Sequence, residues 1–365
     1  MTGGKWPELD LGKICGADMH AASACKARIA ELAMPPGSLG RLEDFAVQLA
    51  GIRGRMVYSI GKKRIVVCCG DNGVTEEGVS SAPKEVTALQ AMNIAAGHSG
   101  MSSMAEVFGA EVQVVDFGIE TPYASGIIKN CRIRAGTGNI RSGPAMTREE
   151  TIRAVRGGME LAAEAKQDGI GAVGVGEMGI GNTTTSSAVV SVLTGRPPEE
   201  VTGRGGGITD AQLENKIACI RDAIRFNRPD PEDPVDILSK VGGLDLAAMC
   251  GVYLGCASER IPAVMDGFIS YAAALCAVRM VPETKTVLFP SHGSAEAGYK
   301  AAAEELGIWP VMHLGMRLGE GSGCPFGFAV LDAACAFVSG MATFSEIGLS
   351  DDYLDPIRAE KRFQE

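Results

Sequence analysis

The sequence predicts an α/β protein built on a doubly wound, Rossmann-like parallel sheet, together with a second, smaller helical domain. Short runs rich in β-branched residues alternate with alanine-rich helical segments along the middle of the chain. Glycine is abundant, at 48 of 365 residues, while aromatic residues make up 5%, a composition typical of tight turns between strands and helices. Hydrophobic residues account for 46% of the chain, enough for a sizeable core.

The predicted strands are short apolar runs that each end at a glycine or a polar residue: 64–69, 112–116, 170–175, 261–265 and 286–290. The predicted helices between them cover 86–96, 149–167, 182–193, 209–227, 245–256 and 268–280. Strands separated by helices form parallel sheets covered on both faces. Helices are also predicted at 20–52 and 326–347. We therefore expect a small helical domain of residues 1–60 together with 326–365, and a large α/β domain of residues 61–325.

Composition excludes several classes of protein. A net charge of −10 argues against binding to nucleic acid or to an anionic membrane, because both need clustered Lys and Arg. No apolar run reaches membrane-spanning length, and residues 1–20 lack the features of a signal peptide. The 11 cysteines contain no C-x-x-C pair, which favours buried thiols in a reducing compartment and hence a cytoplasmic protein. The four histidines are dispersed, so no metal site is predicted.

Polar residues follow the ends of five predicted strands. They are Asp71, Asp116, Glu177, Asp266 and His292. Ligands of open parallel sheets bind at the carboxyl ends of the strands. We therefore predict that these five side chains share the rim of one active site.

A glycine-rich segment, 174–184, follows a predicted strand and opens a predicted helix. It contains G-x-G-x-x-G, which is compatible with a dinucleotide site. However, Glu177 lies where a pyrophosphate would approach and would repel it. The Gly-Asn-Thr-Thr run at 181–184 suits a single phosphate, held by backbone N–H groups and hydroxyls at a helix N-terminus. Capping of the helix by Asn182 or Thr183 explains this run equally well.

A second glycine loop, 201–207, precedes a helix that carries Lys216. Glycines let backbone amides close on an anion and Lys supplies a positive charge, although a flexible turn with a solvated lysine is the simpler alternative. In segment 316–323, Glu320 lies among glycines before an apolar helix. Apolar surroundings raise the pKa of a carboxylate and suit it to general-base catalysis. Electrostatic stabilisation of the following helix is the alternative.

Taken together, these segments resemble the nicotinate-nucleotide–dimethylbenzimidazole phosphoribosyltransferase family over nearly the whole chain. Besides 174–184 and 316–323, the resemblance is carried by PPGSLGRLE at 35–43, GDNGV at 70–74, GNI at 138–140, GPAM at 143–146, SKVGG at 239–243, DGF at 266–268, SH at 291–292 and SAE at 294–296.

The resemblance implies transfer of the phosphoribosyl group of nicotinate mononucleotide to a lower-ligand base, such as 5,6-dimethylbenzimidazole, for cobamide biosynthesis. The products are an α-riboside 5′-phosphate and nicotinate, and no cofactor is implied. The family forms homodimers. Some relatives instead pair with a paralogous subunit and use phenol or p-cresol, so a heterodimer remains an alternative.

The resemblance also implies roles for individual residues. Glu320 matches the catalytic general base, and Glu177 matches a second carboxylate near the ribose. Positions around the nucleotide phosphate are Gly181, Asn182, Thr183, Gly205 and Lys216, with Lys216 coming from the same chain or from a partner. The wall of the base pocket is assigned to Gln90, Met178 and Leu318, and Met316 is assigned to the same substrate site.

Two positions that are expected to touch the acceptor depart from the family pattern. Asn72 replaces a usual histidine, and Ala82 stands where some members present Ser or Tyr. These departures leave the acceptor open among benzimidazole, purine and phenolic bases. Two further hypotheses stay open at this point: a dinucleotide-dependent oxidoreductase using the G-x-G-x-x-G segment, and a non-catalytic partner subunit.

Overall fold

The computed structural model describes residues 6–360. Within them the chain divides into two compact units, the larger made of residues 6–15 and 62–327 and the smaller of residues 16–61 and 328–360. Residues 6–15 thus group with the larger unit, whereas the sequence analysis placed them in the small domain. The reason is that the Trp6 indole donates a 3.2 Å hydrogen bond to Asp233, and Arg156 donates one of 2.8 Å to the Glu8 carbonyl.

The larger unit contains a six-stranded parallel sheet in the order β3-β2-β1-β4-β5-β6. The strands are β1 Lys62–Gly70, β2 Ala110–Gly118, β3 Lys129–Asn130, β4 Ile170–Met178, β5 Ala263–Met265 and β6 Leu288–Pro290. Every residue of β4 is buried, as expected for a central strand covered on both faces. The predicted doubly wound α/β fold is confirmed.

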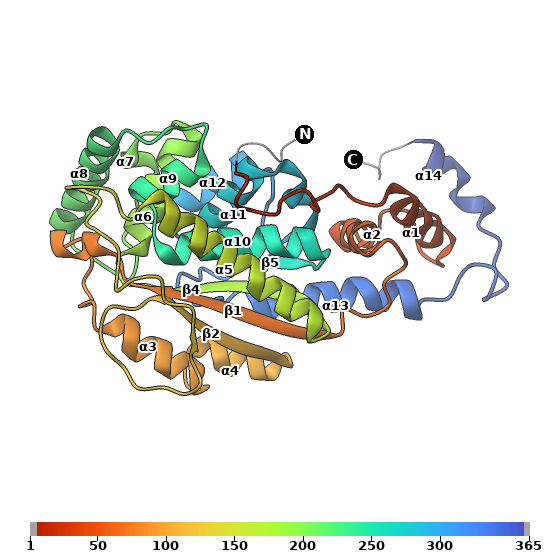
Figure 1. Cartoon of the computed structure of the whole chain (residues 1–365). Helices are drawn as coiled ribbons and strands as arrows, with labels where there is room; N and C mark the ends of the chain where they lie inside the picture. The colour runs from red at the N-terminus through yellow and green to blue at the C-terminus, as the bar shows by residue number, and fades with distance from the viewer. Residues whose placement is uncertain (1–5, 361–365) are drawn as a thin grey trace. The chain divides into compact units, whose positions relative to one another are not determined.

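Helices cover both faces of this sheet (Figure 1). On one face lie α3 Val86–Ala95 and α4 Gly100–Val107, and on the other α5 Arg148–Gln167 and α10 Leu244–Glu259. The remaining helices of this unit are α6 Asn182–Thr194, α7 Pro198–Val201, α8 Asp210–Asn227, α9 Pro234–Val241, α11 Phe268–Met280, α12 Gly298–Leu306 and the start of α13 Cys324–Gly340. Glycine lets α5 and α10 approach closely, since a Cβ at Gly251 would stand 2.0 Å from the Val155 carbonyl oxygen.

The smaller unit is helical and draws on both ends of the chain. It contains α1 Met19–Glu31, α2 Arg41–Arg53, the rest of α13 and α14 Asp355–Ala359. An antiparallel bridge between Leu32 and Thr343 joins its two chain segments. Throughout residues 6–360, every helix is too short or too polar to span a lipid bilayer.

The strand order reverses between β1 and β4, which lie side by side although they are distant in sequence. In a doubly wound sheet this reversal opens a crevice at the carboxyl ends of the two strands, where ligands bind. Strand β1 ends at Gly70 and β4 ends at Met178. The fold therefore places the end of segment 174–178 beside the expected ligand crevice.

Candidate active site

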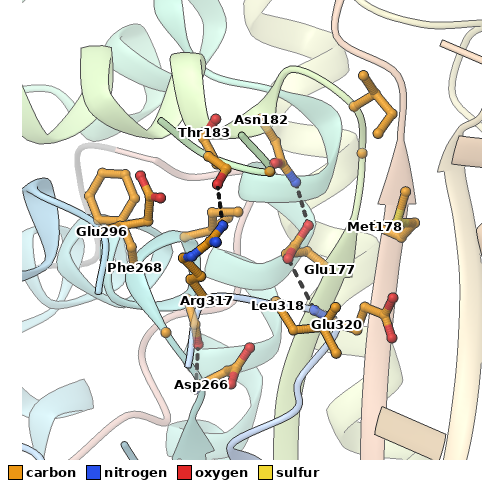
Figure 2. Close-up of a pocket in the computed structure, with 18 of the residues that line it drawn as sticks. Glu177, Met178, Asn182, Thr183, Asp266, Phe268, Glu296, Arg317, Leu318 and Glu320 are labelled. Carbon is orange, nitrogen blue, oxygen red and sulfur yellow. Dashed lines mark hydrogen bonds between the residues drawn. The ribbon is translucent and has the colours of Figure 1, made fainter. Parts of the chain in front are cut away.

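A cavity of about 390 Å³ lies in the larger unit at the carboxyl ends of β4 and β5 (Figure 2). Of the residues assigned to the site from sequence, most line this cavity: Glu177, Glu320, Gly181, Asn182, Thr183, Gly205, Gln90, Ala82, Met178 and Leu318. Lys216, Asn72 and Met316 do not line it. Ten of these residues thus share one cavity, and three lie outside its wall.

Glu177 occupies the end of β4 and is almost completely buried, with 6% of its surface exposed. Its carboxylate accepts hydrogen bonds from the side-chain amide of Asn182 and from the backbone N–H of Glu320, the latter at 3.2 Å (Figure 2). Burial, reinforced by the nearby charge of Asp245, raises the pKa of Glu177 to about 8 in spite of these donors. The pKa of this carboxyl therefore lies close to neutral pH, where both its protonated and its ionised forms are populated.

Glu320 is buried and points away from Glu177, because its Oε1 atom accepts a 2.6 Å hydrogen bond from the Gln90 amide on α3. Burial raises the pKa of Glu320, and the Gln90 hydrogen bond opposes this shift. The backbone of Glu320 is left-handed, with φ of 63° between Gly319 and Gly321. Such a conformation is strained for a residue with a side chain and is characteristic of functional positions.

Glycines within β4 make room for the Glu320 backbone. A Cβ at Gly176 would stand 2.4 Å from the Glu320 carbonyl oxygen, and one at Gly174 would stand 2.6 Å from the Cβ of Cys324. The first two glycines of the G-x-G-x-x-G run thus lie inside the strand, where they leave space for the segment from Glu320 to Cys324. A dinucleotide fingerprint instead uses its glycines in the turn between strand and helix. The structural context of a dinucleotide site is therefore missing here.

Asp266, which follows β5, holds the loop on the far side of Glu320. Its carboxylate accepts hydrogen bonds from the backbone N–H groups of Gly321, at 3.1 Å, and Gly323, at 2.6 Å. It also lies 3.2 Å from Nε2 of His292. Burial disfavours the charged imidazole, but the pairing with Asp266 outweighs this and raises the pKa of His292. Both residues line the cavity, as the strand-end pattern predicts.

The strand-end prediction is wrong for Asp71 and Asp116, neither of which lines the cavity. Asp116 is buried, accepts a 2.7 Å hydrogen bond from the Ile119 N–H and pairs with Arg132. Asp71 accepts a 2.7 Å hydrogen bond from the Glu120 N–H. Both carboxylates therefore hold the loops after β1 and β2 in place.

The opposite end of the cavity carries the features expected of a phosphate site. Helix α6 begins after Gly181, whose φ is 93°, and has no side-chain cap, so capping by Asn182 or Thr183 does not explain this sequence run. Lys216 on α8 donates hydrogen bonds to Thr183 Oγ1 at 2.8 Å and to the Gly203 carbonyl at 3.1 Å. Lys216 is 1% exposed, and burial lowers its pKa to about 8. It supports Thr183 from behind the cavity wall.

Sequence reasoning assigned no site role to Arg317, although this side chain lines the cavity and donates a hydrogen bond of 3.5 Å to the Gly205 carbonyl. The segment 316–323 was recognised for its glycines and Glu320 only. An arginine in an irregular loop gives no pattern that distinguishes it from solvated surface residues.

Asn72 does not touch the cavity, contrary to expectation. It is 1% exposed, donates to the Gly70 carbonyl at 3.4 Å and accepts from the Thr185 hydroxyl at 3.4 Å. The glycine at position 181 allows Asn72 to pack beneath the start of α6. Ala82 does line the cavity, together with Ser80 and Ser81. Met316 is half-buried, and its backbone carbonyl accepts the Ala295 N–H at 3.2 Å.

Comparison with known proteins identifies the family. The model of a family described as phosphoribosyltransferase matches residues 14–349. The chain belongs to this phosphoribosyltransferase family. Enzymes named nicotinate-nucleotide–dimethylbenzimidazole phosphoribosyltransferase are similar to it: that of Ruminiclostridium cellulolyticum is 48% identical over 93% of this chain and 96% of the relative. That of Clostridium perfringens is 46% identical over 96% of this chain and 97% of the relative.

Solved structures agree with this family membership. The crystal structure of CobT from Thermus thermophilus matches with a TM-score of 0.87 at 37% identity, covering 91% of this chain and 99% of that one. The family resemblance seen in the sequence is confirmed. These phosphoribosyltransferases lend no support to the oxidoreductase alternative, in agreement with the position of the β4 glycines.

Proposed function

We propose that this phosphoribosyltransferase transfers the phosphoribosyl group of nicotinate mononucleotide to an aromatic lower-ligand base such as 5,6-dimethylbenzimidazole. The products are an α-riboside 5′-phosphate for cobamide biosynthesis and nicotinate. One observation carries this proposal: two buried carboxylates share the cavity but face different ends of it. Glu177 is bound to Asn182, next to Thr183, whereas Glu320 is bound to Gln90.

The proposed chemistry follows from this division. Nicotinate leaves from a cationic pyridinium, so the bond between ribose and nitrogen is weak and the transition state resembles an oxocarbenium ion. Glu177 lies at the ribose end, where an ionised carboxylate would stabilise the developing positive charge. The acceptor enters on the opposite face of the ribose and inverts the β configuration to α. Glu320, on the acceptor side with Gln90, then takes the proton of the attacking base.

The phosphate of the nucleotide is assigned to the loop of Gly205 and the start of α6, where Gly181, Asn182 and Thr183 lie. Arg317 supplies a positive charge at the cavity wall and Lys216 supplies one immediately behind Thr183. Backbone N–H groups at a helix start and two cations suit one phosphate group. A homodimer is the proposed assembly, a heterodimer with a paralogous phenol-using subunit is the alternative, and the cytoplasm is the proposed location.

The proposal is tested by incubating the purified protein with nicotinate mononucleotide and a panel of benzimidazoles and phenols, with products identified by mass spectrometry. Excess EDTA is included, because nicotinate departs with a neutral ring nitrogen and needs no Lewis acid. We expect an α-riboside 5′-phosphate and one equivalent of nicotinate. The proposal would be overturned if the protein released no nicotinate with any acceptor, whether it is assayed alone or together with a paralogous chain. Saturable binding of NAD(H) would instead favour the oxidoreductase.

A further inference from the structure

Asp245 is a fully buried carboxylate at the start of α10, behind Glu177 and outside the cavity lining. Its Oδ2 atom accepts a 3.1 Å hydrogen bond from Nδ2 of Asn182. The same Nδ2 atom also donates to Oε2 of Glu177. One amide group therefore joins the two buried carboxylates.

We propose that Asp245 is a positioning residue that holds the Asn182 amide with its NH₂ group toward Glu177 and keeps this end of the cavity negative. The inference rests on the transfer reaction proposed above. An asparagine amide presents either an acceptor or a donor when it rotates by half a turn. A second carboxylate on the same NH₂ group favours one orientation, in which both N–H bonds end on acceptors.

The surrounding backbone fixes Asp245 itself. Its Oδ1 atom accepts the Leu246 N–H at 2.9 Å, in the first turn of α10. Two glycines then enclose the carboxylate: a Cβ at Gly243 would stand 2.4 Å from Oδ1, and one at Gly179 would stand 2.8 Å from Oδ2. A side chain at either position would collide with the carboxylate, so the two glycines leave space for it, and its hydrogen bonds with Leu246 and Asn182 hold it in place.

Burial raises the pKa of Asp245 itself to about 6, so its negative charge acts on Glu177 above this pH. The other titratable groups around Glu177 are Asp266 after β5, Glu320 before α13, and the thiols of Cys68 and Cys69 on β1. Burial raises the pKa of both thiols well above the ordinary value, so they stay neutral. His292 is engaged with Asp266.

This arrangement makes the proton on Glu177 sensitive to Asp245. A neighbouring negative charge stabilises the protonated form of a carboxyl group. Removing that charge should let Glu177 ionise at lower pH. A developing cation on the ribose needs the ionised form, so the change should be visible in turnover at low pH.

The test is the pH dependence of kcat/KM for nicotinate mononucleotide in the parent enzyme and in Asp245→Asn. We expect the acid limb of the profile to move to lower pH by about one pH unit. The same change made in a Glu177→Gln background should produce no further movement of the residual profile. Asp233→Asn is the matched control, since Asp233 also accepts N–H groups at a helix start but lies at α9, outside the cavity.

A purely structural role would lower the melting temperature of Asp245→Asn and leave the acid limb in place, and this result would overturn the inference. If Asp245→Asn does not fold, Asp245→Ser keeps an oxygen for the Leu246 N–H without the charge and is judged by the same criterion. Failure of the proposed function is recognised separately, because the parent enzyme would then show no transfer at any pH.

Discussion

The side-chain amide of Gln90 lies 2.6 Å from Oε1 of Glu320, and these two residues come from opposite ends of the large unit's sequence. Because a hydrogen bond to a carboxylate favours its ionised form, Gln90 counteracts the effect of burial on Glu320. The two residues therefore act together in setting the pH at which the proposed general base becomes available.

Replacing Gln90 by Leu should raise the pKa of Glu320 further, because burial then acts unopposed by this donor. Turnover should fall more at pH 6 than at pH 9, moving the acid limb of the kcat profile upward. Gln167→Leu is the control, since Gln167 is exposed at the end of α5. An equal loss of turnover at both pH values would show that Gln90 contributes only contact area.

Glu320→Gln should reduce turnover by about 10²–10⁴-fold, the usual effect of removing a general base. Nicotinate mononucleotide should still bind, because the substitution leaves the phosphate end intact. Kinetics with a benzimidazole acceptor and equilibrium binding of the nucleotide give the two measurements. Glu85→Gln, at an exposed position before α3, is the matched control. Near-normal activity of Glu320→Gln would remove Glu320 from its assigned role.

Lys216 should make nucleotide binding weaker at high pH. Its pKa of about 8 is lowered by burial, so the ammonium is present below this pH and is lost as the pH rises through it. The KM for nicotinate mononucleotide should therefore increase above pH 8, although bound phosphate will move the transition upward. Lys216→Met should raise KM most at pH values below the transition, where the parent carries the charge, and should abolish this trend. Lys300→Met, on the exposed side of α12, should leave both unchanged.

Glu177 should weaken the fold of the ligand-free protein at high pH. Its pKa is near 4.5 when unfolded and about 8 when folded, so the folded state resists ionisation between these values. Stability is therefore lost as pH rises from about 4.5 to 8, and the penalty is fully present above 8. In Glu177→Gln the change in melting temperature relative to the parent should become more positive from pH 5 to pH 8.5. A pH-independent difference would contradict this account.

Ala82 should influence the choice of acceptor. It presents a methyl group in a cavity wall where a hydroxyl could bind the second nitrogen of a benzimidazole. We predict that the enzyme uses phenol and p-cresol better than a typical family member. Ala82→Ser should raise the preference for benzimidazole over phenol by roughly 2- to 12-fold, the equivalent of one neutral hydrogen bond of about 0.5–1.5 kcal/mol. Competition assays measure this ratio, and Ser81→Ala tests whether the neighbouring hydroxyl already serves the acceptor. If the parent enzyme does not turn over phenol or p-cresol, with or without a paralogous chain, the prediction is refuted.

The alternation of apolar runs and alanine-rich segments was sufficient to predict the sheet, because parallel strands buried on both faces have a nearly continuous apolar pattern. Strand β3 was missed because it has only two residues, Lys129 and Asn130, and neither is apolar. Helices α4, α9 and α12 were also missed; each is short, at 8, 8 and 9 residues respectively. Two or three helical turns give little periodicity to detect.

The site was predictable where a residue type and its strand-end position agreed, as at Glu177, Asp266 and His292. The site was not predictable where the direction of a side chain decides whether a residue lines the cavity. Asn72 and Asp71 lie next to each other after β1, yet neither lines the cavity. Asp245 gave no signal at all, because a carboxylate at a helix start is ordinarily explained by capping. Its hydrogen bond to Asn182 depends on a contact between residues that are 63 positions apart.

The contact of Gly176 with the Glu320 backbone has a practical consequence for laboratory evolution of acceptor range. Any side chain at Gly176 would displace the loop that carries Glu320, the proposed general base, since even a Cβ would collide with the Glu320 carbonyl. Saturation libraries should therefore leave Gly174 and Gly176 fixed, despite their proximity to the cavity. Diversity belongs instead at residues 80–82 and at Leu318, which line the cavity from loops outside the regular helices and strands. In such libraries, substrate scope and folding would then be governed by different positions.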